Sequence, residues 1–285
     1  VYEKGEENLK ELINKKILIQ DDKECLYVYE IFLNGVSQTG VGCVASVEAY
    51  EKNIIKKHEY TKPVKEDDRV NNIIKLNAQT GPVLLAYKNN NEISKFLNKV
   101  KNENPTYNVI AHDNSNHKIW IVEDSKRIKE ILDEINSMDS LFIADGHHRS
   151  AAALRVKKEL SKKNPNHIGD ENYNYFLAVA FPHSEMNILD YNRIIKGLNG
   201  HTTDTLLSNI EKKFSVKKHE IEFKPKNINT FGMYLENYWY ELITNQENIN
   251  SIDPVKSLDV SILHDLIIEP LLGITDERTD PKIDF

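Results

Sequence analysis

The 285-residue sequence predicts an α+β fold with mixed, largely antiparallel sheets and flanking helices. The first observation is residues 25–47, where β-branched and aromatic runs are broken by an Asn-Gly pair at 34–35, the strongest short signal for a β-hairpin. The second is residues 107–124, which predict another hairpin with a polar tip. The third is that apolar residues have helical spacing at 92–100 and 128–135, on either side of that hairpin. Strands and helices mixed in this order are typical of α+β proteins.

The remaining N-terminal part predicts one helix and one exposed segment. Residues 9–18 carry leucine and isoleucine at the spacing of one helix face. Residues 51–70 are rich in charge, contain a proline and have no long apolar stripe, so we expect a surface segment that crosses a site. Residues 73–87 predict a short helix, a turn at Thr80-Gly81-Pro82 and a strand.

The C-terminal half continues the same alternation. Its expected elements are strands at 141–143, 175–182 and 215–223, a hairpin at 231–243, and helices at 148–162, 203–214 and from 257 to a stop at Pro270. Ile283 and Phe285 read as the start of a further strand. Because both ends are abrupt, we expect a chain truncated at both ends. A polar connection near 160–172 predicts a boundary between two regions, 1–165 and 166–285.

Composition narrows the class of protein. The net charge is −7 with both signs interspersed, which argues against nucleic acid as the main partner. No apolar run is long enough to span a bilayer, so we expect no membrane partner. The two cysteines form neither a CxxC pair nor a disulfide framework, which favours a reducing, cytoplasmic compartment. The sequence does not indicate an oligomeric state.

The stretch "LFIADGHHRSAAALRVKKEL" at 141–160 carries the clearest site signal. An apolar strand ends at Asp145, Gly146 allows a tight turn, and a helix follows whose first N–H groups are free to bind an anion. Arg149 supplies a charged fork for phosphate oxygens, and His147 and His148 donate hydrogen bonds or carry protons. These five residues, here called the DGHHR loop, predict a phosphate-binding site. The plainer alternative is a helix cap with a solvated first turn.

A metal held by the two adjacent histidines is a weaker interpretation, because neighbouring residues on a helix point about 100° apart.

A second set of chemical groups lies at "KKHEYTKPVKEDDR", residues 56–69, here called the HE segment. His58 and Glu59 follow an apolar strand end, and Arg69 comes within the next turns. Glu59 suits a general base or a metal-binding carboxylate, and the lysines suit a phosphate. A solvated charged loop is the alternative for this segment taken alone.

These motifs resemble a known family. "HEYTKPVKEDDR" and "ADGHHRSAAA", with "LNAQTGPV", "YNRIIKGLNG" and "SLDVSILHDLIIEPLLGITDERTDPKIDF", are similar to the bacterial and archaeal family catalogued as domain of unknown function 1015, over essentially the whole chain. The resemblance extends to free-serine kinases of the ParB/sulfiredoxin-like superfamily, which carry a similar HE…R element and a DGHHR loop before a helix. It implies a ParB/sulfiredoxin-like phosphate-binding core, in a nucleotide-binding region at 1–165.

The kinase resemblance also implies a reaction. It implies transfer of phosphate from ATP or ADP, with Mg²⁺, to a small hydroxylated metabolite, with L-serine as the acceptor by analogy. The implied catalytic residues are Glu59, as the base, and His58. The implied phosphate and nucleotide contacts are Asp145, Gly146, His147, His148, Arg149 and Arg69, with Asp145 also a ligand of Mg²⁺. Sulfiredoxin chemistry is disfavoured, because it needs a cysteine at the phosphate loop.

The residues leave alternatives for the acceptor pocket, for two further side chains and for the function. Glu59 and Asp145 lie 86 positions apart with a β-rich segment between them, which leaves the acceptor pocket undefined. Arg193 suits a substrate carboxylate or phosphate, and a structural salt bridge is the alternative. His264 lies on an apolar helix, and this pattern is more typical of a core histidine than of a ligand. The runner-up function is a nucleotide-binding regulatory switch without metabolic kinase activity, since a shared phosphate site does not fix the reaction.

Overall fold

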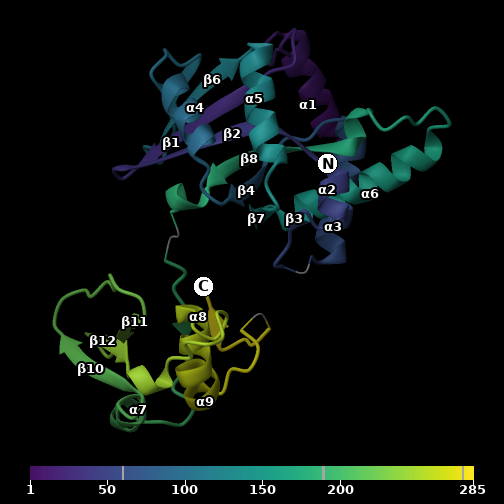
Figure 1. Ribbon diagram of the computed structural model, residues 1–285. Coiled ribbons are helices and arrows are strands. Elements are labelled where there is room, and N and C mark those ends of the chain that lie inside the picture. Colours follow the sequence, from purple (N-terminus) through teal and green to yellow (C-terminus); the bar gives the residue numbers. More distant parts are fainter. Residues whose placement is uncertain (60, 188–189, 278) are drawn as a thin grey trace. The chain divides into compact units, whose positions relative to one another are not determined.

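The computed structural model describes residues 1–59, 61–187, 190–277 and 279–285, and the chain folds as two compact units, Val1–Ile188 and Leu189–Phe285 (Figure 1). The predicted α+β class is confirmed, with a large mixed sheet in the first unit. The units divide later than the sequence boundary near 165, because the strand at 175–182 pairs inside the sheet of the first unit.

The first unit is built on an eight-stranded sheet in the order β3-β7-β4-β8-β2-β1-β6-β5. Its strands are β1 (Leu26–Leu33), β2 (Val36–Ser46), β3 (Ile55–Lys56), β4 (Val83–Tyr87), β5 (Tyr107–Ile110), β6 (Asn116–Val122), β7 (Leu141–Asp145) and β8 (Tyr175–Pro182). β3 with β7 and β4 with β8 are parallel, and the other neighbours are antiparallel. The predicted hairpin turn is confirmed, because Asn34 and Gly35 have φ of 51° and 82°, the left-handed values of a two-residue type I′ turn.

Helices cover this sheet. They are α1 (Tyr2–Asn14), α2 (Val47–Glu51), α3 (Pro63–Leu76), α4 (Asn91–Lys101), α5 (Ser125–Asn136) and α6 (His147–Lys163), with the short 3₁₀ turns η1 (Asn172–Asn174) and η2 (His183–Glu185). Ile93 and Ile131, from the neighbouring α4 and α5, enter the main core with Val28 and Trp120 of the sheet (Figure 1). α3 packs on α6 through a smaller apolar cluster, and α1 packs on α3.

One prediction for this unit was wrong. The helix expected from residue 73 begins at Pro63, inside the charged stretch at 51–70 that we expected to be a surface segment. Its apolar contacts with α6 start only at Val70, so the first two turns show no apolar stripe in the sequence. Those turns are held by Arg155 of α6, which donates to Glu66 at 3.2 Å and to Asp67 at 2.6 Å. Ion pairs between two helices leave no periodic signal in a single sequence.

The second unit has its own core. It contains β9 (Ile194–Ile195), α7 (Thr203–Ile210), β10 (Phe214–His219), β11 (Thr230–Leu235), β12 (Tyr238–Thr244), the 3₁₀ turn η3 (Gln246–Asn248), α8 (Asp259–Leu263), the π-helical turn η4 (His264–Ile268), α9 (Glu269–Leu272) and β13 (Ile283–Asp284). An antiparallel sheet has the order β10-β12-β11, and β13 pairs with β9, so the strand expected at Ile283 is confirmed. Phe214, Leu242, Ile268 and Ile274 are buried between the sheet and the helices.

The expected helix stop at Pro270 was also wrong. Pro270 lies inside α9, and the helix ends at Gly273, which has a φ of 69°. The π-helical turn η4 comes directly before α9, where the hydrogen-bonding pattern shifts and the proline can donate no backbone bond. Among the described residues, no helix has both the length and the apolar character that a membrane span requires.

Candidate functional site

Two segments far apart in the sequence meet at one edge of the large sheet. β3 runs parallel to β7, with Ile55 opposite Leu141 and Lys56 opposite Phe142. The carboxyl ends of parallel neighbours lie at the same edge, so the HE segment leaves the sheet beside the DGHHR loop (Figure 1). β4 is antiparallel to β7, and its amino end with Pro82 therefore reaches the same edge.

The DGHHR loop has the predicted strand, turn and helix geometry. β7 ends at Asp145, Gly146 has a φ of 98°, and α6 begins at His147. No side chain caps α6, and the first backbone bonds within the helix come from the N–H groups of Arg149 and Ser150 to the carbonyl of Gly146. The N–H groups at the start of a 17-residue helix therefore face the site without a side-chain cap, which is the arrangement that binds anions.

Glu59 and His147 form the first contact between the two segments. The Oε2 atom of Glu59 lies 3.4 Å from the Nδ1 atom of His147, and the His58 ring packs edge-on against the His147 ring at 4.4 Å. His147 is buried, with 4% of its side chain exposed, whereas Glu59 is 57% exposed. Burial and the nearby His58 lower the pKa of His147, so its imidazole is neutral near pH 7.

The proton on that neutral ring follows from its neighbours. A carboxylate only accepts hydrogen bonds, so the Glu59 carboxylate 3.4 Å away favours the tautomer with the proton on Nδ1 of His147. Its Nε2 then has a lone pair and no proton. This Nε2 atom is buried and has no hydrogen-bond partner among the residues that the structure describes. It is suited to accept a bond from a hydroxyl group rather than donate one to phosphate.

His148 makes the second contact between the segments. Its Nε2 atom accepts a hydrogen bond from the backbone N–H of Lys62 at 3.1 Å, which puts the proton of a neutral ring on Nδ1. Close by, the Thr61 hydroxyl donates to Glu66, and Glu66 in turn accepts from Arg155. These bonds attach residues 61–66 to α6 and fix the side of the site that the HE segment forms.

Arg149 connects three pieces of backbone at the sheet edge. Its Nη2 donates to the Asp145 carboxylate and its Nη1 to the carbonyl of Pro82. Gly146 and Gly81 make room for the guanidinium, since a Cβ atom there would lie 3.1 Å from Nε and 3.3 Å from Nη1. A guanidinium has five N–H groups, so two bonds leave others for an anion.

Two residues predicted for the site form ion pairs with other residues in the structure. Arg69 pairs with its neighbour Asp68 at 3.0 Å on an exposed part of α3. Arg193 belongs to the second unit, where its Nε donates to Glu277 at 2.9 Å and both side chains are about 15% and 16% exposed. The salt bridge that we considered as the alternative for Arg193 is therefore present.

Sequence reasoning gives no role to several residues that shape the site. They are Thr61, Glu66, Gly81, Pro82 and Arg155. Glu66 and Arg155 are 89 positions apart, and no short motif joins them. The sequence signal for this part of the site was the pair Gly81-Pro82. That pair is as typical of an ordinary turn as of backbone that an arginine side chain approaches closely.

The comparisons identify one family. A sequence model described as "Protein of unknown function (DUF1015)" matches residues 1–261. Neither the curated proteins nor the solved structures include a significant match to the chain.

Proposed function

The chain belongs to the DUF1015 family, and from this premise we propose that it is a small-molecule kinase. It transfers a phosphoryl group from ATP or ADP to the hydroxyl of a small metabolite, and L-serine is the first acceptor to test because of the motif resemblance to free-serine kinases. In this proposal the sheet edge that holds the DGHHR loop is a ParB/sulfiredoxin-like phosphate-binding core. The two short motifs support that assignment.

One observation carries the proposal, which is the contact of Glu59 with His147. A carboxylate that is open to solvent lies beside the first residue of a long, uncapped helix, where an anion binds. Phosphoryl transfer needs a base beside the attacking hydroxyl and positive charge around the phosphate. The HE segment supplies the first and the DGHHR loop supplies the second, although they are 86 positions apart in sequence.

In the reaction, Glu59 accepts the proton of the acceptor hydroxyl while that oxygen forms its bond to the terminal phosphorus. The bond from phosphorus to the leaving nucleotide oxygen breaks, and ADP or AMP departs. Neutral His147, with Nδ1 3.4 Å from the Glu59 carboxylate, orients it in this proposal, in the way that a second group orients a catalytic base. His58 packs on the other ring and helps to fix its position.

The phosphates bind on the other side of the site. Their contacts are the N–H groups at the start of α6, the Nδ1 of His148 and the free N–H groups of Arg149. Asp145 fits Mg²⁺, because its carboxylate is exposed, forms a surface ion pair with Arg149 and offers the oxygen ligands that this ion prefers. Bound Mg²⁺ neutralises phosphate charge. Because Arg69 pairs with Asp68 on α3, its part in binding is the least supported of the predicted contacts.

The test is a ³¹P NMR assay of the chain with Mg²⁺, ATP or ADP, and a panel of hydroxylated metabolites led by L-serine. We expect a new phosphomonoester signal. Glu59→Gln keeps the size of the side chain and removes the base, so turnover falls by about 10²–10⁴-fold while nucleotide affinity stays within a few fold. Glu48→Gln is the matched control, because Glu48 of α2 is similarly exposed and forms a surface ion pair with Lys52.

An unchanged rate in Glu59→Gln would remove Glu59 from the mechanism. If no ester forms but a nucleotide binds in a manner that requires Arg149, the regulatory switch becomes the better assignment. If neither ATP nor ADP binds, the DGHHR loop is a helix cap and not a phosphate site.

A further inference from the structure

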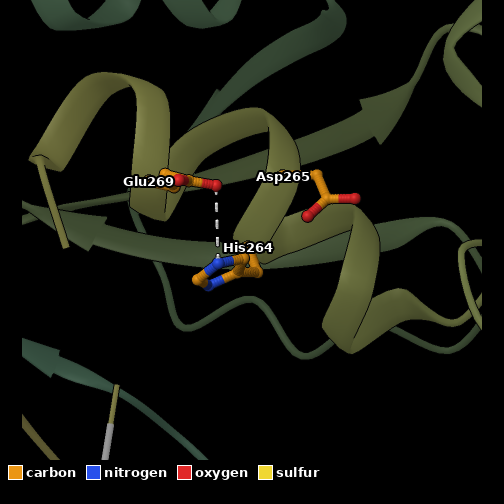
Figure 2. A group of neighbouring side chains, drawn as sticks. All are labelled: His264, Asp265 and Glu269. Carbon is orange, nitrogen blue, oxygen red and sulfur yellow. Dashed lines mark ion pairs between the residues drawn. The ribbon is translucent and has the colours of Figure 1, made fainter. Parts of the chain in front are cut away.

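A second group of potential ligands lies in the second unit, outside the site described above. His264 and Asp265 begin the π-helical turn η4, and Glu269 is the first residue of α9. Their ligand atoms all lie within 4.8 Å of one another. Figure 2 shows His264 and Glu269 facing each other, with Asp265 beside them. The Nε2 atom of His264 lies 3.7 Å from the Oε2 atom of Glu269.

The π-helical turn is what brings these three residues together. In an α-helix, successive residues turn by about 100°, so residue i+5 lies about 140° around the axis from residue i. In a π-helical turn the backbone bonds run from i to i+5, which brings residue i+5 much closer to the face of the helix that carries residue i. Glu269 is therefore placed near His264 instead of on the far side of the helix. π-turns of this kind are frequent at functional sites.

His264 is oriented by groups outside the cluster. Its Nδ1 donates to the Oε1 of Glu277 at 3.0 Å, and the other oxygen of Glu277 accepts from Arg193 at 2.9 Å. The Glu277 carboxylate is 16% exposed, so both bonds are shielded from water. Metal-bound histidines usually donate their second ring nitrogen to a carboxylate in this way, which fixes the tautomer and points the other lone pair at the metal. Here the free lone pair is on Nε2, the atom that faces Glu269.

We propose that His264, Asp265 and Glu269 bind one divalent transition-metal ion, with Zn²⁺ bound more tightly than Co²⁺ or Mn²⁺. One imidazole and two carboxylates are a ligand set suited to these ions, whereas Mg²⁺ and Ca²⁺ prefer oxygen ligands alone. Both carboxylates are exposed, and in the part of the chain that the structure describes no lysine or arginine forms an ion pair with Asp265 or Glu269. Bonds of about 2.0–2.2 Å require the carboxylates to turn inward by roughly an ångström, which exposed side chains are free to do.

The proposal is independent of the kinase assignment, because its ligands belong to the other unit. The experiment is isothermal titration of the whole chain, without a histidine tag and without nucleotide, with Zn²⁺ and separately with Mg²⁺. We expect one Zn²⁺ ion to bind at this site. With Co²⁺ in its place, we expect a visible absorption spectrum that is typical of nitrogen and oxygen ligands. Glu269→Gln and Asp265→Asn each weaken Zn²⁺ at least tenfold, and Mg²⁺ binds far more weakly than Zn²⁺ here.

The matched control is Glu241→Gln. Glu241 lies 3.1 Å from His219 in the same unit, so this change removes a contact between a histidine and a carboxylate without touching the proposed ligands. Its Zn²⁺ affinity stays as in the unmodified chain. Glu277→Gln is a positioning variant, and we expect a 10- to 100-fold loss of Zn²⁺ affinity with the Co²⁺ spectrum still present.

Two results would overturn the assignment. One is that neither Glu269→Gln nor Asp265→Asn weakens Zn²⁺ binding, or that the chain binds no Zn²⁺. The cluster would then be an ion-pair network around His264. The other is equal weakening by Glu241→Gln, which would mean that surface charge and not this site sets the affinity. Circular dichroism of each variant shows whether it is folded, and both ligand substitutions are at exposed positions.

Discussion

Replacing Gly146 by alanine tests how the DGHHR loop is built. Gly146 has a φ of 98°, a backbone conformation that residues with a side chain rarely adopt. A Cβ atom there would also lie 3.1 Å from the Nε of Arg149. Both the backbone and the arginine must therefore adjust. We expect Gly146→Ala to lower the free energy of unfolding of the first unit and to move the guanidinium away from Asp145 and Pro82.

The size of the effect comes from two contributions. A left-handed backbone costs an alanine about 1–2 kcal/mol. Losing the bond from Arg149 to the Pro82 carbonyl adds about 0.5–1.5 kcal/mol, and the exposed pair with Asp145 adds little. The expected total is roughly 1.5–3.5 kcal/mol.

Gly81→Ala separates the two contributions. A Cβ atom at Gly81 would lie 3.3 Å from the Nη1 of the same arginine, but Gly81 is not among the residues with positive φ. It therefore disturbs Arg149 without the backbone cost, and we expect a loss smaller by about 1–2 kcal/mol.

Urea unfolding followed by fluorescence measures both variants. The chain has two tryptophans, one in each unit, so a Trp239→Phe background leaves buried Trp120 to report on the unit that contains the site. Equal losses for the two alanine variants, or a loss below about 0.5 kcal/mol for Gly146→Ala, would refute the argument that the left-handed turn is required.

Two further predictions concern buried groups. Burial and His58 lower the pKa of His147 in the folded state, so below about pH 6.5 the unfolded chain binds a proton that the folded chain does not. The free energy of unfolding therefore decreases as the pH is lowered, by at most about 1.4 kcal/mol per pH unit. His147→Asn should flatten this part of the stability profile measured by urea titration between pH 7 and 5, and an unchanged slope would contradict it. Burial raises the pKa of the Cys43 thiol to about 11, so at pH 8 a disulfide reagent should modify Cys25 first. A Cys25→Ser chain that still reacts at the original rate would show that Cys43 is accessible.

Local signals predicted the elements that the chain determines locally. The pair Asn34-Gly35 specifies its own turn, and Asp145-Gly146 specifies the change from strand to helix, because the required backbone angles belong to those residues. The predicted hairpin at 231–243 is present for the same reason, with Glu236 and Asn237 both at positive φ.

Contacts between distant residues could not be predicted in this way. The start of α3 at Pro63 depends on Arg155, which lies 89 positions from its partner Glu66. The contact of Glu59 with His147 depends on β3 pairing with β7, and the apolar strand end before His58 does not indicate which strand it pairs with. The π-helical turn before Pro270 depends on packing of the second core. The sequence alone does not indicate this turn, because a proline at that position is also typical of a helix end.

The position of β3 also affects the order in which the molecule opens. This two-residue strand lies at the edge of the sheet and is paired on one side only, and its pairing closes a chain loop of more than eighty residues. Edge strands with few hydrogen bonds exchange their amide protons through local opening, well below the free energy of global unfolding. The loop-closure entropy also delays such a contact until the intervening chain is ordered. We therefore expect the site to assemble late in folding and to be lost first on partial unfolding, while β1, β2 and β8 remain paired.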